Sequence, residues 1–217
     1  MAHAYHRTLI ARLGFADRDR QLPEHDFACQ YLARAEVMRA ILAPYLPQPE
    51  QRLAPKFGSP ERVYGIYTQV LAPTFSAPRF EVPIPRGRPP SGSVVGFLDL
   101  VLSGEVAVVY EERERSTEQL RYGPQQMRVS PRVLLEVKIT PTNVSEILRQ
   151  LQFYRQHLDP AGERYAWVAV TRFPISVEDK AMLTGAGIGH LRLGARFEAY
   201  RQHLRSRTRP MADSPEI

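Results

Sequence analysis

Three short apolar runs, rich in β-branched residues, form the framework of this 217-residue chain. Residues 94–102, 133–139 and 165–171 each have the length and composition of a strand within a sheet. Helical patterns separate the last two runs and follow the third, which is typical of an α/β protein with a mixed sheet. Charged residues stand inside the first two runs, and these residues are the first candidates for chemistry.

Helical spacing of apolar residues is clearest over residues 143–157. Asn143 is the predicted N-cap of this helix, and Glu146 stands at the position that completes a capping box. A further helix is predicted over residues 176–185, where a following glycine ends it, and a last helix over residues 197–205.

The N-terminal third is predicted to be mainly helical over residues 7–43. A start near Asp26 follows a proline, and Pro44 ends the segment. Residues 44–62 are rich in proline and polar residues and are predicted to form a loop. Residues 63–72 fit either a short helix or a strand, and the pattern leaves both open.

The remaining strands are less regular. Residues 79–85 predict an edge strand. Their two prolines lack the backbone N–H groups that a central strand donates to its neighbours. Residues 103–104, Ser-Gly, predict a tight turn before a strand over residues 105–110. Residues 111–132 are highly charged and predict an exposed excursion from the sheet, and residues 190–193 predict a last strand.

These elements follow the order α-β-β-β-α-β and predict a mixed sheet flanked by helices, with an N-terminal helical extension. We expect three parts along the chain. Residues 1–75 form a helical extension and loop packed on the core, residues 76–205 form the core, and residues 206–217 form a disordered tail.

Composition narrows the class of partner. The net charge of +6 and the pI near 9.7 favour a polyanion, and arginine suits bidentate phosphate contacts. Cys29 is the single cysteine, so an internal disulfide, a zinc finger and an iron–sulfur site are excluded, and a small buried hydrophobe is the expected role. No apolar run approaches the length of a membrane span and no signal-peptide pattern stands at the start, so we expect a cytoplasmic protein without a membrane partner.

Asp99, Glu136 and Lys138 are the charged residues inside the apolar runs. Glu136 and Lys138 are two apart in a strand, so their side chains leave the same face while the alternate apolar residues leave the other. Each residue alone fits a charge that faces water, and Glu136 with Lys138 also fits a surface ion pair of little energetic value.

Taken together, the three residues fit a metal-assisted reaction. Two carboxylates on neighbouring strands repel each other unless something neutralises them. Mg²⁺ does so, since it prefers carboxylate oxygens together with water and phosphate. A metal ion lowers the pKa of a bound water, and a lysine beside it offsets charge that develops in the transition state. These are the parts that phosphodiester hydrolysis needs.

Three short motifs in order resemble the PD-(D/E)XK nuclease superfamily, and its RecB-like branch in particular. Residues 96–99 match a GxxD motif, residues 136–138 an ExK motif, and residues 150–154 a QxxxY motif on the helix after the lysine strand. The resemblance covers roughly residues 79–193. Leu98 replaces the proline of the superfamily's name, and without a cysteine cluster the iron–sulfur members are excluded as close models.

The resemblance implies a restriction-endonuclease-like fold and a metal-dependent nuclease. It implies that Asp99 and Glu136 bind Mg²⁺ or Mn²⁺, with Lys138 as the catalytic lysine. Gln150 and Tyr154 would contact the metal-bound water and the substrate phosphate, and their spacing of four places them on one helix face. A core aromatic is the other interpretation of Tyr154, and it is compatible with this role.

Many members of the superfamily carry a further acidic residue or histidine on the first helix as a metal ligand. Glu36, Glu24 and His25 are the candidates here, and Glu36 and His25 are retained as candidate ligands. A solvated residue is the alternative for each, and His25 with Asp26 also fits a helix-start cap.

Two basic segments are candidates for nucleic-acid contact. The arginines of residues 111–132 are mixed with glutamates, so they fit either a DNA-contacting flap or a solvated hairpin. The C-terminal segment is purely basic, and two of its arginines lie one helical turn apart, as phosphate contact would need. Its members are Arg201, Arg205, Arg207 and Arg209.

The leading hypothesis is a metal-dependent nuclease that hydrolyses DNA, in DNA defence, repair or mobile-element processing. The alternative is a non-catalytic nucleic-acid-binding or scaffold subunit with a nuclease-like fold. The chain has no ATPase motif, so any motor would be a partner protein in a larger complex, and a homodimer is a further possible partner arrangement.

Overall fold

The computed structural model describes residues 22–86, 93–160 and 165–208. Within them, strands and helices form a mixed α/β structure built on a nine-stranded sheet. Its main strand order is β1-β2-β5-β7-β8-β9, and β3, β4 and β6 each pair with β5. The strands are β1 Arg52–Leu53, β2 Val63–Val70, β3 Thr74–Phe75, β4 Arg79–Arg86, β5 Ser93–Glu114, β6 Leu120–Val129, β7 Arg132–Lys138, β8 Ala166–Thr171 and β9 Ile188–Arg192.

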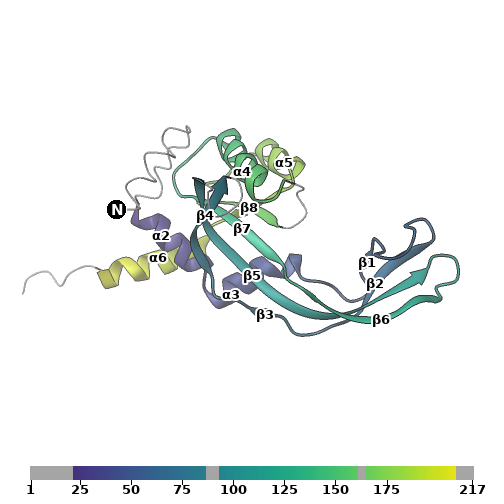
Figure 1. The fold of residues 1–217 in the computed structure, drawn as a ribbon. Coiled ribbons are helices and arrows are strands. Elements are labelled where there is room, and N and C mark those ends of the chain that lie inside the picture. The colour runs from purple at the N-terminus through teal and green to yellow at the C-terminus, as the bar shows by residue number, and fades with distance from the viewer. Residues whose placement is uncertain (1–21, 87–92, 161–164, 209–217) are drawn as a thin grey trace, which may run out of the picture.

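Helices cover both faces of the body of the sheet (Figure 1). The helices are α2 Pro23–Leu32, α3 Ala35–Leu42, α4 Val144–Leu158, α5 Val177–Gly185 and α6 Ala195–Thr208, with a 3₁₀ turn at Ala43–Tyr45. One core packs β5 and β7 against α2, α3 and α6, and the other packs the opposite face against α4 and α5. None of the described helices is long and apolar enough to cross a membrane.

β7 lies between the two cores and positions the charged residues. Val133, Leu135 and Val137 belong to the core under α2 and α3, whereas Leu134 belongs to the core under α4. This alternation confirms the predicted faces of the strand. β7 is antiparallel to β5 and parallel to β8, and α4 makes the crossover between β7 and β8.

The predicted turn at Ser103-Gly104 is wrong, because β5 continues through it as one strand of 22 residues. Ser103 pairs with Arg132 of β7, and Gly104 pairs with Phe75 of β3, so partners on both sides keep the chain extended. Gly104 does not adopt a positive φ. A Cβ there would meet the Thr74 carbonyl oxygen at 3.1 Å, so the glycine permits a close approach of β3.

The predicted helix over residues 7–43 is confirmed only in part, since residues up to 21 lie outside the described ranges. The described part is two helices, with Arg34 extended between them at φ −65° and ψ 140°. Arg34 lies over the Tyr200 ring of α6, and Tyr31 packs against the same ring. The break therefore coincides with contacts to α6 that helical periodicity cannot reveal.

Other predicted elements are confirmed. Asn143 caps α4 by accepting a hydrogen bond from the Ser145 amide, and β4 pairs only with β5, as an edge strand does. Of residues 63–72, for which a helix and a strand were both open, Val63–Val70 form the strand β2, which pairs with β5. The sheet therefore begins within the predicted N-terminal extension of residues 1–75. The last helix continues to Thr208, beyond the predicted start of a disordered tail at 206, and residues 209–217 lie outside the described ranges.

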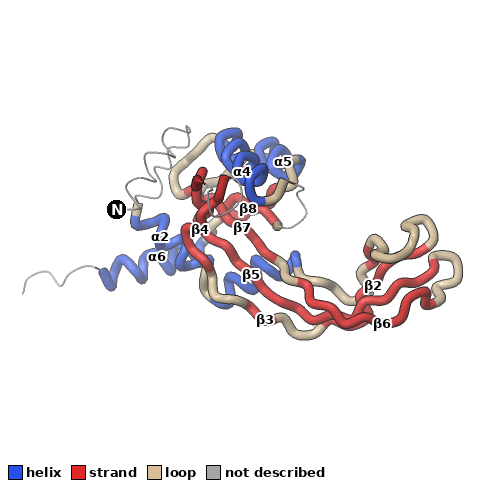
Figure 2. The backbone as a smooth tube through the Cα atoms, in the orientation of Figure 1, coloured by secondary structure: helices blue, strands red, loops and turns tan. Residues whose placement is uncertain are grey.

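A long arm extends from the helix-covered body (Figures 1 and 2). We define the arm as residues 50–70 and 105–129, which contain β1, β2, the distal half of β5, and β6. The predicted charged excursion of residues 111–132 is thus mostly a hairpin of β5 and β6.

Candidate active site

The candidate site lies where β5 and β7 separate. Their antiparallel pairing ends at Leu100 and Leu135, and one further step in that register brings Asp99 opposite Glu136. The Asp99 carboxylate accepts a hydrogen bond from the Val137 amide at 2.7 Å, just beyond the last paired residues. The predicted residues of β5 and β7 therefore meet at a single junction of the sheet.

Glu136 is the centre of a buried hydrogen-bonded network on the α4 side. Its Oε1 accepts from Lys138 Nζ at 2.9 Å and from Gln150 Nε2 at 2.8 Å. Gln150 Nε2 also lies 2.9 Å from the Tyr154 hydroxyl. All four side chains are buried, with Glu136 fully so. Such interactions are strong in a low-dielectric setting, so the surface ion pair considered for Glu136 and Lys138 is ruled out.

Gly96 gives the Tyr154 ring room beside the network. A Cβ on Gly96 would lie 2.5 Å from Tyr154 Cε1 and 2.9 Å from its hydroxyl oxygen. Because Tyr154 is buried, the ring has little freedom to withdraw. The glycine of the GxxD motif therefore has a local steric explanation.

We expect Gly96→Ala to destabilise the protein by about 1–3 kcal/mol, the usual cost of overpacking a core. Urea unfolding followed by circular dichroism measures the change. Gly123→Ala is the matched control, because a Cβ at Gly123 meets nothing within 4 Å. Equal stability of the two variants would show that the Tyr154 ring is not held against Gly96.

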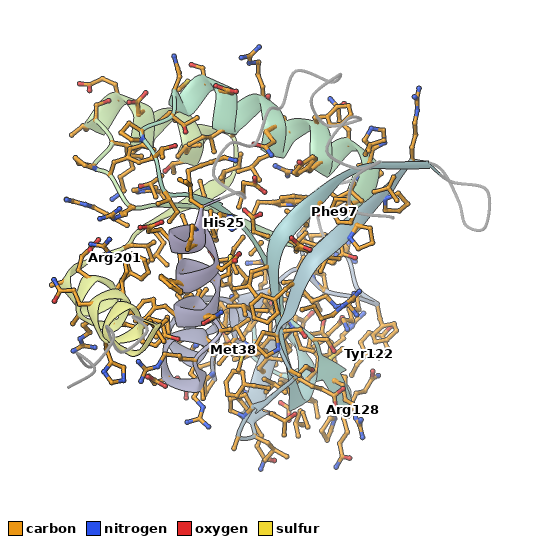
Figure 3. All side chains as sticks on the ribbon, turned by 90° about the vertical axis from the view of Figure 1, so that its left-hand side faces the viewer. His25, Met38, Phe97, Tyr122, Arg128 and Arg201 are labelled. Carbon is orange, nitrogen blue, oxygen red and sulfur yellow. The ribbon has the colours of Figure 1, made fainter. Side chains whose placement is uncertain are left out.

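His25 of α2 contacts Asp99 from the other side of the sheet. Its Nε2 lies 3.4 Å from Asp99 Oδ1, and its Nδ1 lies 3.9 Å from the Cys29 sulfur. Burial alone lowers the pKa of His25, but its contacts with Asp99 and Cys29 outweigh burial and raise that pKa to about 11. Leu22 holds the N-cap position of α2, so His25 is not the cap of this helix. Figure 3 shows His25 at the end of α2 that faces the strands.

The other first-helix candidates lie elsewhere. Glu36 is at the exposed surface of α3, where its carboxylate lies 2.6 Å from Arg34. The Glu24 carboxylate lies 3.9 Å from Arg201 of α6. Of the three candidates, His25 is the one that the structure places against Asp99.

The Arg201 side chain of α6 is 14% exposed and lies beside two carboxylates, those of Glu24 and Glu198. Its guanidinium lies 2.8 Å from Glu198, which also pairs with Arg172. Burial raises the pKa of Glu198, but Arg172 and Arg201 outweigh it and leave this pKa below its ordinary value. For Arg205 and Arg207 only the helical backbone is described, and Arg209 lies outside the described ranges.

Sequence reasoning did not single out Thr171, which neighbours Lys138 in the parallel ladder of β7 and β8. Thr171 is fully buried, and its hydroxyl lies 2.8 Å from the Phe173 carbonyl and 2.9 Å from His190 Nε2. The sequence signal that could have singled out Thr171 is its place as a polar residue at the end of an apolar strand.

Cys29 is buried among apolar residues, as predicted.

Carboxylates are the side chains that a hard divalent cation prefers, and the junction contains two of them. In the part of the chain that the structure describes, no group of three histidine, cysteine or acidic side chains is arranged to hold a metal ion. Mg²⁺ does not require such a group, because it commonly binds through one or two carboxylates and takes its other oxygens from water and phosphate. Asp99 and Glu136 are the two carboxylates at the junction, and they are the residues from which such a cation would take its protein ligands.

The chain was compared with known families, proteins and structures. No family model, curated protein or solved structure matches the chain.

Proposed function

We propose that this chain is a metal-dependent nuclease that hydrolyses DNA phosphodiester bonds, on a restriction-endonuclease-like fold. The observation that carries the proposal is the convergence of Asp99, Glu136 and Lys138 at one buried junction of β5 and β7. A sheet that only faced water would leave these charges exposed, whereas all three are buried. DNA defence, repair or mobile-element processing are the settings that suit such an enzyme.

Asp99 and Glu136 are the residues that would hold Mg²⁺ or Mn²⁺. When bound, the cation would lower the pKa of a water and polarise a phosphoryl oxygen. Lys138 places its ammonium beside Glu136, where it offsets negative charge that develops on a phosphate. Because the ammonium is already in place, the protein does not have to rearrange its dipoles when this charge develops.

Gln150 and Tyr154 act as positioning residues for the carboxylate. The Gln150 amide group donates to Glu136 and is itself held by the Tyr154 hydroxyl, so one face of α4 fixes the Glu136 rotamer. His25 plays the corresponding role for Asp99 through the contact with Oδ1. His25 is also the better placed of the two candidate first-helix ligands, because Glu36 is paired at the surface.

A non-catalytic scaffold is the second candidate, and one observation favours it. Lys138 and His25 already lie against the two carboxylates, so the junction is balanced by the chain's own cations. A scaffold would keep this balance as a structural device and would have no reason to bind Mg²⁺.

Calorimetric titration with Mg²⁺ and Mn²⁺ separates these two functions. The nuclease proposal predicts saturable binding that weakens at least about tenfold in Asp99→Asn and Glu136→Gln, since each removes a carboxylate ligand. Glu178→Gln on the exposed face of α5 is the matched control and should bind like the wild type. Absence of binding by the folded wild type, or equal binding by all variants, would support the scaffold.

A further inference from the structure

The edge strand of the arm, β6, carries positive charge only. No acidic residue occurs between Gln119 and Leu135, whereas Arg121, Arg128 and Arg132 lie in this stretch. β6 is exposed along almost its whole length, and among the described strands it pairs with β5 alone. Lys56 adds a cation from the neighbouring loop, with its ammonium 3.4 Å from the Met127 sulfur of β6.

The carboxylates near β6 are largely engaged within the arm itself. Glu112 is fully buried and accepts hydrogen bonds from the backbone amides of Lys56 and Phe57 in the loop between β1 and β2. Glu111 pairs with Arg113, Glu118 with Arg52, and Glu105 with Arg128. Within the part of the chain that the structure describes, no ion pair engages Lys56 or Arg121. Lys56 lies over the Tyr110 ring, 5.2 Å from its centroid, and this contact leaves its positive charge without a carboxylate partner, so both cations can contact an external anion.

Exposed apolar side chains accompany these two cations. Phe57 and Tyr122 are 55% and 43% exposed, and their ring centroids lie 5.6 Å apart. Leu120 beside them is 53% exposed. Exposed cations beside a tyrosine are a combination that suits the backbone of duplex DNA, since lysine, arginine and tyrosine side chains all contact phosphate oxygens.

The edge of β6 is poorly suited to pairing with a strand of a second copy. The ladder between β5 and β6 shifts between Gln125 and Tyr122, which leaves Gly123 and Pro124 out of register. Bulges and prolines are the features that blunt an edge strand against strand addition. Recognition along this edge is therefore left to side chains.

We propose that the arm is a second DNA-contacting surface, in which Lys56 and Arg121 contact phosphates and Tyr122 with Phe57 packs against the nucleic acid. The inference rests on the proposed function, since DNA held at the junction of β5 and β7 is what the arm would extend along. β5 connects the two regions as one strand. At about 3.3 Å per residue, β5 spans about 26 Å from Asp99 to Ala107, opposite Arg128, and about 43 Å to Glu112, opposite Tyr122.

These distances set a length requirement. At about 3.4 Å per base pair, a duplex that starts at Asp99 reaches Arg128 after about 8 base pairs and Tyr122 after about 13. A duplex shorter than about 13 base pairs cannot contact both the junction of β5 and β7 and the region of Tyr122. Its affinity therefore lacks the contribution of one of these two regions.

The test is fluorescence anisotropy with labelled duplexes of 8 and 20 base pairs, in EDTA so that no cleavage occurs. The arm variant is Lys56→Ala with Arg121→Ala. The control is Lys180→Ala with Arg196→Ala, which removes the same charge from exposed positions on α5 and α6. Circular dichroism confirms that each variant folds, as exposed substitutions usually do.

We expect the wild type to bind 20 base pairs more tightly than 8, and the arm variant to lose this gain through a weakening of roughly tenfold on the longer duplex. The salt slope of log K should fall by about 1.8, for two phosphate contacts. The control should match the wild type. Equal affinities of wild type and arm variant for the longer duplex, or equal losses in arm variant and control, would overturn the proposal.

Failure of the arm surface and failure of the nuclease give different results. If the wild type cuts DNA and the arm variant binds DNA normally, the nuclease proposal stands and the arm proposal is rejected. If the wild type never cuts DNA but the arm variant loses DNA binding, the arm proposal stands and the nuclease proposal is rejected.

Discussion

Lys138→Ala is expected to lower DNA cleavage by roughly 100- to 1000-fold while Mg²⁺ binding persists. In the structure the Lys138 ammonium lies 2.9 Å from Glu136, within the buried junction. Removing it takes away a preorganised positive charge but leaves the carboxylates of Asp99 and Glu136. The initial rate of DNA cleavage measures the first effect, and calorimetry measures the second.

Lys138→Met is a second variant for this prediction, because its side chain is of similar length and keeps the packing around Glu136. Lys180→Ala is the control for loss of an exposed lysine. Cleavage by both Lys138 variants at the wild-type rate would contradict the role given to this residue. Loss of Mg²⁺ binding in both, with an intact fold, would show that Lys138 shapes the metal site and is not a separate catalytic group.

Glu112→Ala is expected to destabilise the protein by about 2–4 kcal/mol, because it leaves the buried Tyr110 hydroxyl and two part-buried backbone amides without an acceptor. Glu112 Oε1 accepts hydrogen bonds from the amides of Lys56 and Phe57 and, at 2.8 Å, from the Tyr110 hydroxyl. These bonds fasten the loop between β1 and β2 across the arm. Urea unfolding measures the loss.

The same site predicts a pH dependence. Burial alone raises the pKa of Glu112, but the hydrogen bonds from the Phe57 and Lys56 amides and the Tyr110 hydroxyl outweigh it, and the pKa lies below its ordinary value of 4.5. A carboxyl of this kind contributes stability above pH 4.5 and loses it as the pH falls through the folded-state pKa. Glu112→Gln should therefore flatten the acid limb of the stability curve.

Glu105→Ala is the control for the Glu112 prediction. Glu105 is half exposed and pairs with Arg128 at the surface of the arm, where an ion pair contributes little. We expect a change within about 0.5 kcal/mol for this variant. If Glu112→Ala were as stable as Glu105→Ala, the loop would not depend on the buried carboxylate.

Local patterns predicted the strands and the faces of the candidate site. Alternation placed Glu136 and Lys138 on one face of β7, and the spacing of four placed Gln150 and Tyr154 on one face of α4. Both relations depend on residues close in sequence, whose geometry the backbone period fixes. The three motifs are therefore brought together as their order along the chain suggested.

Contacts between distant elements were harder to predict. The contact of His25 with Asp99 depends on how α2 docks on the sheet, so sequence could only rank His25 with Glu36. The continuity of β5 through Gly104 depends on β3 and β7 as partners, and a Ser-Gly pair favours a turn when those partners are unknown. The excursion at residues 111–132 was predicted from its charge, but its extension of β5 into one continuous arm depends on the same distant pairing.

The central claim is tested most directly by incubating the wild type with supercoiled plasmid and with linear single- and double-stranded DNA, in Mg²⁺, in Mn²⁺ and in EDTA. A metal-dependent nuclease should cut DNA in Mg²⁺ or Mn²⁺ and stop in EDTA, and the comparison of circular with linear DNA separates internal from end attack. A folded protein that retards DNA on a gel but cuts none of these substrates would contradict the nuclease proposal and leave the non-catalytic binding module as the better account.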